Sequence, residues 1–127
     1  MKVMKMAEVP SIAIDDPDFK PGKATRQIFS DADRGNLDVV MVHFGKGCRN
    51  PWHTHSSDQV IMVIFGKGIV ATEEKEYEVG PGDLIIVPAG EVHWQGATQD
   101  SEFSHFYVFQ RGCKTTVVRP HKNTKAT

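Results

Sequence analysis

The sequence is poor in cysteine and has no long apolar run. Cys48 and Cys113 are its only cysteines in 127 residues, too few for the disulfide scaffold of a small secreted protein, so we expect two free thiols. The first ten residues lack the apolar segment of a signal peptide, and no later stretch is long enough to span a membrane. These absences predict a cytoplasmic protein without a membrane partner.

An excess of basic charge is also missing. The chain has 15 Lys and Arg against 16 Asp and Glu, a net charge of −1, so there is no electrostatic basis for binding nucleic acid. It contains no internal repeat and no low-complexity tract. Its length fits one domain with a core of its own.

Helical periodicity is absent over any useful length. Short runs rich in β-branched and aromatic residues alternate instead with turns of Gly, Pro, Asn and Asp. The runs predicted as strands are 25–29, 37–44, 60–65, 69–72, 77–79, 84–87, 93–97, 103–110 and 115–118. This spacing predicts an all-β barrel or sandwich over residues 23–118. The proline-rich segment 1–22 is predicted to be an irregular arm that packs on the barrel or on a partner subunit, and 119–127 to be a flexible tail.

Three histidines and one glutamine have the spacing of a metal site. His53 and His55 are separated only by Thr54, so on a strand they share one face. Gln59 follows after a short polar kink, and a closed fold is needed to bring in His93. Imidazole suits Zn, Cu, Fe and Ni and, with oxygen ligands beside it, Mn, so the pattern leaves the metal open.

The spacing around these residues resembles the two motifs of the cupin superfamily. The first motif, a Gly, an HxH pair, an acidic ligand and a second Gly, is matched by Gly47, His53, His55, Gln59 and Gly66. The second is matched by Gly82, Pro88, Gly90 and His93, with Ala97 in place of its usual Asn. The resemblance implies a cupin β-barrel of the jelly-roll type, a double-stranded β-helix.

Within the cupins, residues 39–110 resemble small single-domain members. This group includes the manganese-dependent hydroxynitrile lyases and the cupins associated with carboxymuconolactone decarboxylase. The resemblance rests on Trp52, Trp94, Gly96 and the later His105, besides the ligand positions. It implies one divalent ion per chain, manganese first and iron, nickel or zinc as alternatives, held by His53, His55, Gln59 and His93. It also implies a homodimer, and a role for His105 as acid/base; the simpler alternative for His105 is a core histidine bonded to backbone.

Gln59 stands where the cupin motif has glutamate. A neutral amide leaves a divalent site near its full charge of about +2, whereas a carboxylate would lower the charge by one. Such an ion is a better Lewis acid and a poorer stabiliser of a higher oxidation state. The substitution favours polarisation of a substrate oxygen over dioxygen chemistry.

Strand alternation predicts an apolar, aromatic pocket for a compact or planar substrate. If His105 faces inward, Phe103, Tyr107 and Phe109 share its face and Phe106 points away. On the strand 37–44, Val40 and Val42 are predicted to line the same pocket, with His43 directed elsewhere.

These observations favour a metal-dependent enzyme acting on a small molecule. The leading hypothesis is a lyase of the hydroxynitrile-lyase type that uses the ion as a Lewis acid. The alternatives are a quercetinase-like dioxygenase and a non-catalytic module in which the metal only anchors a small ligand.

Overall fold

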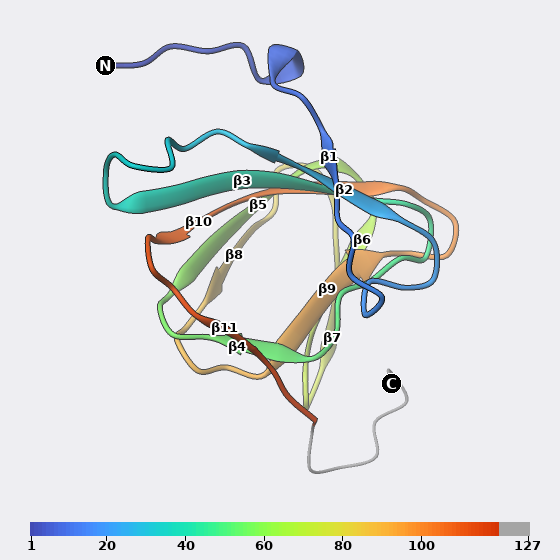
Figure 1. Cartoon of the computed structure of the whole chain (residues 1–127). Coiled ribbons are helices and arrows are strands. Elements are labelled where there is room, and N and C mark those ends of the chain that lie inside the picture. The colour runs from blue at the N-terminus through green and yellow to red at the C-terminus, as the bar shows by residue number, and fades with distance from the viewer. Residues whose placement is uncertain (120–127) are drawn as a thin grey trace.

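Two antiparallel β-sheets build the structure, a computed structural model that describes residues 1–119 (Figure 1). Sheet A is ordered β1-β2-β3-β10-β5-β8, and sheet B is ordered β11-β4-β9-β6-β7. The strands after β1 are β2 (Ala24–Ile28), β3 (Leu37–Phe44), β4 (His53–His55), β5 (Gln59–Gly66), β6 (Gly68–Thr72), β7 (Glu76–Val79), β8 (Leu84–Val87), β9 (His93–Ala97), β10 (Phe103–Gln110) and β11 (Thr115–Val117). The predicted all-β class is confirmed.

The N-terminal segment contains two short elements and lies against the barrel. A 3₁₀ turn, η1 (Met6–Glu8), precedes the two-residue strand β1 (Ile12–Ala13), which pairs with β2. Further along, Lys20 and Arg49 exchange two backbone hydrogen bonds of 3.1 Å, which fix the end of the segment to the barrel. Of the predicted tail, residues 120–127 lie outside the described part of the chain.

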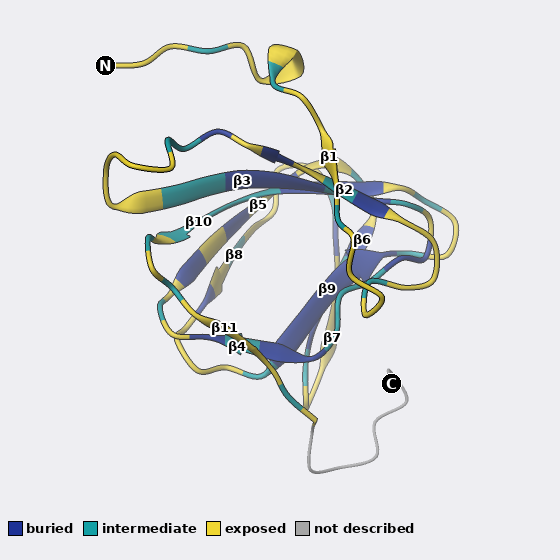
Figure 2. Cartoon of the chain, viewed as in Figure 1, coloured by how far each residue is buried: buried dark blue, intermediate teal, exposed yellow. Residues whose placement is uncertain are grey.

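The core lies between the sheets, on the inward faces of their strands (Figure 2). Its main cluster includes Phe44, Val63 and Phe103, all at most 2% exposed. The Phe103 ring packs so close to Gly68 that an added Cβ there would come within 2.5 Å of it. Trp52 and Trp94 belong to a separate cluster, where their rings meet edge to face with centroids 6.5 Å apart. Both tryptophans are therefore packing residues of the barrel.

Strand β10 keeps its alternation although its partner β5 is irregular. Ser104 pairs with Phe65 and His105 with Val63, so the extra residue of the β-bulge is on β5. His105, Tyr107 and Phe109 consequently share one face of β10. Phe106 lies on the other face, where its ring stacks on Phe29 with centroids 6.0 Å apart.

The outer face of sheet A carries exposed apolar side chains. They come from neighbouring strands β5 and β8, and are Val60, Met62, Ile64, Leu84 and Ile86. The homodimer implied by the family resemblance stays a prediction. Within residues 1–119, no helix has the length and apolar character needed to cross a membrane.

Candidate metal centre and substrate cavity

Neighbouring strands of sheet B bring the three predicted histidine ligands together. His53 and His55 come from β4, and His93 begins β9 directly opposite His53. Their potential ligand atoms all lie within 4.8 Å of one another, and the side chains are between 3% and 6% exposed. Small side-chain rotations would place three nitrogens around a single ion. The His triad is the only group of three or more His, Cys, Asp or Glu residues within residues 1–119 that has this geometry.

Each of these histidines has its Nδ1 engaged in a hydrogen bond. Nδ1 of His53 donates to the carbonyl of Pro51 at 2.6 Å, and Nδ1 of His93 donates to that of Glu91 at 2.8 Å. Nδ1 of His55 lies 2.9 Å from the hydroxyl of Thr115. A carbonyl can only accept, so His53 and His93 carry their proton on Nδ1. That tautomer leaves the Nε2 lone pair free to bind a cation.

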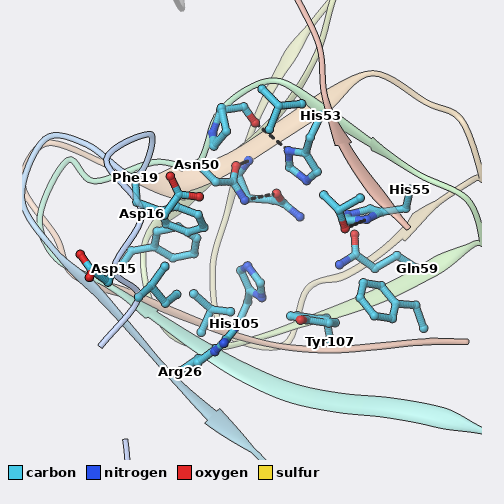
Figure 3. A pocket seen from close by; sticks show the side chains of 18 of the residues that line it. Asp15, Asp16, Phe19, Arg26, Asn50, His53, His55, Gln59, His105 and Tyr107 are labelled. Atoms are coloured by element: carbon cyan, nitrogen blue, oxygen red, sulfur yellow. Dashed lines mark hydrogen bonds between the residues drawn. The ribbon is translucent and has the colours of Figure 1, made fainter. Parts of the chain in front are cut away.

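The unpaired atoms of the cluster fit a metal ion. Nε2 of His55, Nε2 of His93 and Oε1 of Gln59 are buried, and none has a hydrogen-bond partner within residues 1–119. Gln59 begins β5 in sheet A, and Figure 3 shows its amide pointing into the cavity beside His55. Burying unpaired polar atoms is costly, and a cation would satisfy all of them at once. Three neutral imidazoles and an amide oxygen form a donor set suited to a divalent transition metal.

Burial also keeps the imidazoles neutral, which is the form that binds metals. Desolvation, with a smaller contribution from the nearby His93, lowers the pKa of His53 to about 3 and that of His55 to about 4. The pKa of His93 is lowered chiefly by burial as well. The donor atoms are therefore available at neutral pH without loss of protons.

His105 lies in the same cavity without a partner of its own. It is 2% exposed, and within the described residues neither ring nitrogen has a hydrogen-bond partner. Figure 3 shows its ring directed into the cavity from β10. Burial lowers its pKa to about 3, so the imidazole is neutral at pH 7. Neither ring nitrogen makes a hydrogen bond of normal geometry within the described residues, although the backbone of His105 itself acts to raise the pKa of the imidazole. The acid/base role of His105 and its alternative, a core histidine bonded to backbone, both stay predictions.

The cavity has a volume of about 360 Å³ and combines apolar walls with a few polar groups. Of the predicted pocket residues, Val42, Tyr107 and Phe109 line it together with His105. Burial raises the pKa of Tyr107 to about 12, so its hydroxyl stays protonated.

Val40 and Phe103 were predicted to line the pocket but belong to the core. Both are in the main hydrophobic cluster and neither borders the cavity. Phe103 packs against Gly68 and fills its end of the barrel. Val40 on β3 pairs with Tyr107 on β10, and of these two residues only Tyr107 lines the cavity. Alternation predicts the face of a strand correctly, but it does not predict how far along the strand the cavity extends.

Several cavity residues escaped the sequence prediction. The N-terminal segment contributes residues 13–16 and Phe19, and the loop before β4 contributes Asn50. Gln95 is 1% exposed and lines the cavity two residues after His93 on β9. The period of two that relates His53 to His55 also relates His93 to Gln95, and it could have indicated this residue. No local pattern marks the other positions, because tertiary contacts bring them to the cavity.

The fold and the site together define a metal-binding β-barrel, and comparison with known proteins identifies its family. The cupin domain family matches residues 40–109, which is more than half of the chain. The protein belongs to the cupin family.

Two curated relatives have different activities in their names. The chain is 32% identical over 85 residues to an (R)-mandelonitrile lyase of Granulicella tundricola, covering 66% of this chain and 65% of the lyase. It is 31% identical over 102 residues to an acireductone dioxygenase of Exiguobacterium sibiricum, covering 76% of this chain and 54% of the dioxygenase. The chain thus matches less than two thirds of the length of either relative.

Solved structures agree on the fold. A cupin-like protein of Thermotoga maritima superposes with a TM-score of 0.76 at 24% identity, covering 93% of this chain and 89% of that one. A polyketide cyclase of Streptomyces resistomycificus superposes with a TM-score of 0.78 at 19% identity, with coverages of 94% and 87%. At these identities the likeness concerns the barrel alone.

Proposed function

We propose that this cupin is a metal-dependent lyase that cleaves small α-hydroxynitriles into a carbonyl compound and hydrogen cyanide. The observation that carries the proposal is His105, a buried imidazole with two unpaired nitrogens in the cavity that His53, His55 and Gln59 also line. The similarity to a protein named (R)-mandelonitrile lyase supports the same reaction class.

His53, His55, His93 and Gln59 would hold the divalent ion, which we expect to be manganese. When bound, such an ion supplies Lewis-acid polarisation of a substrate oxygen. Because all four side chains are neutral, they leave the ion's charge uncompensated, which favours this chemistry over stabilisation of a higher oxidation state.

His105 would accept the proton of the substrate hydroxyl. As the proton leaves, the bond between the carbinol carbon and the nitrile carbon breaks, its electron pair departs with cyanide, and the carbonyl forms. The imidazole is neutral and ready to accept, and its low pKa means that the imidazolium is costly in this buried position. The proton is therefore passed on to cyanide, which leaves as hydrogen cyanide.

The apolar walls of the cavity would surround the part of the substrate that does not react. Val42, Phe44, Tyr107 and Phe109 give the cavity an apolar wall beside the reacting groups. Such a wall lowers the local dielectric, which strengthens electrostatic interactions next to it, and its aromatic rings accommodate a planar aryl substituent.

The test is cyanide release from mandelonitrile by the manganese-loaded protein and its His105→Ala variant. We expect kcat/KM to fall by about 10²–10⁴-fold, the usual contribution of a general acid or base. Metal content should not change, because His105 is not among the proposed ligands. His43→Ala is the matched control, since the His43 side chain bonds Gln27 and Ser104 and does not line the cavity. Equal activity of His105→Ala and wild type would contradict the assignment.

An acireductone-type dioxygenase is the second candidate, favoured by the match to such an enzyme over 102 residues. It requires a redox-competent metal such as iron and predicts oxygen uptake with an acireductone or a polyphenol. The neutral Gln59 weighs against it. Assaying the iron-loaded protein with an oxygen electrode separates the two reactions. A metal-loaded protein that binds such compounds but turns over none of them would instead be a binding module.

A further inference from the structure

The cavity contains a second glutamine besides Gln59. Gln95 is on β9 two residues after His93, on the same face of the strand, so it lies beside the metal cluster. Its side chain is almost fully buried, at 1% exposure. A glutamine at this depth needs partners for both ends of its amide.

Asn50 fixes which end of the Gln95 amide faces the cavity. The backbone N–H of Gln95 donates to Oδ1 of Asn50 at 2.8 Å, and a backbone N–H can only donate. Oδ1 of Asn50 is therefore the acceptor in this bond, and Nδ2 of Asn50 faces the Gln95 side chain. Nδ2 donates at 2.7 Å to Oε1 of Gln95, so that oxygen is an acceptor as well. A third bond, from the Asn50 N–H to the Gln95 carbonyl at 3.0 Å, holds the two residues together.

This arrangement leaves Nε2 of Gln95 as a hydrogen-bond donor without an acceptor in the described part of the chain. Within residues 1–119, no group accepts a hydrogen bond from Nε2 of Gln95. The two cavity glutamines thus present opposite groups. Oε1 of Gln59 is buried without a partner in residues 1–119 and suits a cation, whereas the Gln95 side chain bonds through Oε1 only and leaves its N–H groups for an acceptor. Figure 3 shows Asn50, with its hydrogen bonds as dashed lines, on the side of the cavity where His53 lies.

We propose that Nε2 of Gln95 donates a hydrogen bond to the nitrile nitrogen of the substrate, with Asn50 as the positioning residue. This assignment rests on the proposed lyase function and specifies what recognises the nitrile. As the carbon–carbon bond breaks and its electron pair moves onto cyanide, negative charge grows at the group that Gln95 contacts. A buried donor held in a fixed direction stabilises that charge more than it stabilises the neutral substrate. The proton still passes from the hydroxyl through His105 to cyanide.

The first experiment compares two ligands that cannot react, on the manganese-loaded protein by titration calorimetry. Mandelonitrile O-methyl ether keeps the nitrile but has no hydroxyl proton, and benzyl methyl ether lacks the nitrile as well. Gln95→Met retains the length of the side chain and removes the donor. We expect it to lower the affinity for the nitrile ligand about tenfold, the worth of one hydrogen bond. Affinity for the plain ether should not change.

A kinetic arm uses mandelonitrile itself. Because the donor meets growing charge, Gln95→Met should lower kcat by about 100-fold, more than it weakens binding. Gln27→Met is the matched control, since Gln27 is also a buried glutamine, 7% exposed, but bonds Met6 and Val9 and does not line the cavity. It should leave both kcat and the nitrile preference unchanged.

Asn50→Asp tests the positioning role. Aspartate offers only acceptors, so one oxygen keeps the backbone N–H of Gln95 and the other attracts its Nε2. The Gln95 amide then turns over and presents Oε1 to the cavity. We expect the nitrile preference to be lost as fully as in Gln95→Met, although Gln95 itself is intact.

The outcomes separate this assignment from the lyase proposal. A nitrile preference that depends on Gln95 in a protein that never cleaves mandelonitrile would support the donor and contradict the lyase. Cleavage at the wild-type rate by Gln95→Met would retain the lyase and overturn the donor. Equal losses of affinity for both ligands, or a wild-type protein without preference for the nitrile, would also overturn the assignment.

Discussion

At the scale of single residues, the metal centre depends on groups that hold the histidine rings. Nδ1 of His55 meets the Thr115 hydroxyl on β11, whereas His53 and His93 use backbone carbonyls that no substitution of a side chain can remove. Thr115 is therefore the one ring-orienting partner of the triad that mutagenesis can test directly. Such outer partners fix both the tautomer and the direction of the ligand lone pair.

Replacing Thr115 by Val should weaken metal binding about 10–100-fold, the usual cost of losing an outer partner of a ligand. Valine matches the shape of threonine and removes only the hydroxyl. Metal affinity can be measured by competition with a chromophoric chelator. Thr116→Val is the control, because Thr116 neighbours Thr115 on the same strand and pairs with Thr54 rather than with a ligand. Identical affinities in the two variants would contradict a role for the Thr115 hydroxyl.

The sequence predicted which residues gather as candidate ligands better than it predicted their surroundings. His53, His55, His93 and Gln59 could be found because their spacing along the chain is set by strand geometry and turns. Thr115 and Asn50 reach the site through contacts with residues 60 and 45 positions away, which leave no local signal. The facing of His105 could be predicted, since alternation on β10 is local and the β-bulge falls on β5.

At the scale of elements, the short β-branched and aromatic runs and the turn residues between them were sufficient to predict nearly every strand. Strands β3, β8, β9 and β10 begin and end where the sequence predicted them. β1 and β4 are not among the predicted runs, because two or three residues are too few to show alternation; β4 was indicated only by the His53 and His55 pair. The pairing of β1 with β2 depends on the path of the whole N-terminal segment. The remaining error concerned how far the cavity extends along the strands, since Val40 and Phe103 were predicted to line it and do not.

The contact between β6 and β10 leads to a prediction about the barrel's core. A Cβ at Gly68 would lie 2.5 Å from the Phe103 ring, so Gly68→Ala should destabilise the protein by about 1–3 kcal/mol through overpacking. Urea unfolding measures the change in the free energy of unfolding. Combining Gly68→Ala with Phe103→Leu, which makes room for the methyl group, should cost less than the sum of the two single changes. Additive costs would indicate that the two positions do not share this space.

At the scale of the whole molecule, buried neutral histidines make the metal-free protein sensitive to acid. The pKa values of His53, His55 and His105 are about 3, 4 and 3 in the folded state, against 6.5 for an ordinary histidine. Between pH 6.5 and about 4 the unfolded chain therefore binds protons that the folded chain does not. By linkage, the free energy of unfolding falls as the pH falls through this range.

The expected slope is at most roughly 1.4 kcal/mol per pH unit for each such histidine. Urea unfolding of chelator-treated protein at pH 7, 6 and 5 measures it. His105→Gln, which removes one of the three groups without touching a proposed ligand, should give a shallower slope than wild type. A free energy of unfolding that stays constant from pH 7 to pH 5 would contradict the buried neutral state of these side chains.

The proposed ligands come from both sheets, three from β4 and β9 in sheet B and Gln59 from β5 in sheet A. An ion held by all four joins the two layers at a point where the side chains are almost closed to solvent. The cavity offers a path to the ion, but its departure would require buried ligands to give way one after another, so exchange with free metal is expected to be slow. A slowly exchanging site would keep the metal that was available while the barrel closed, and the preference of the finished site would matter less.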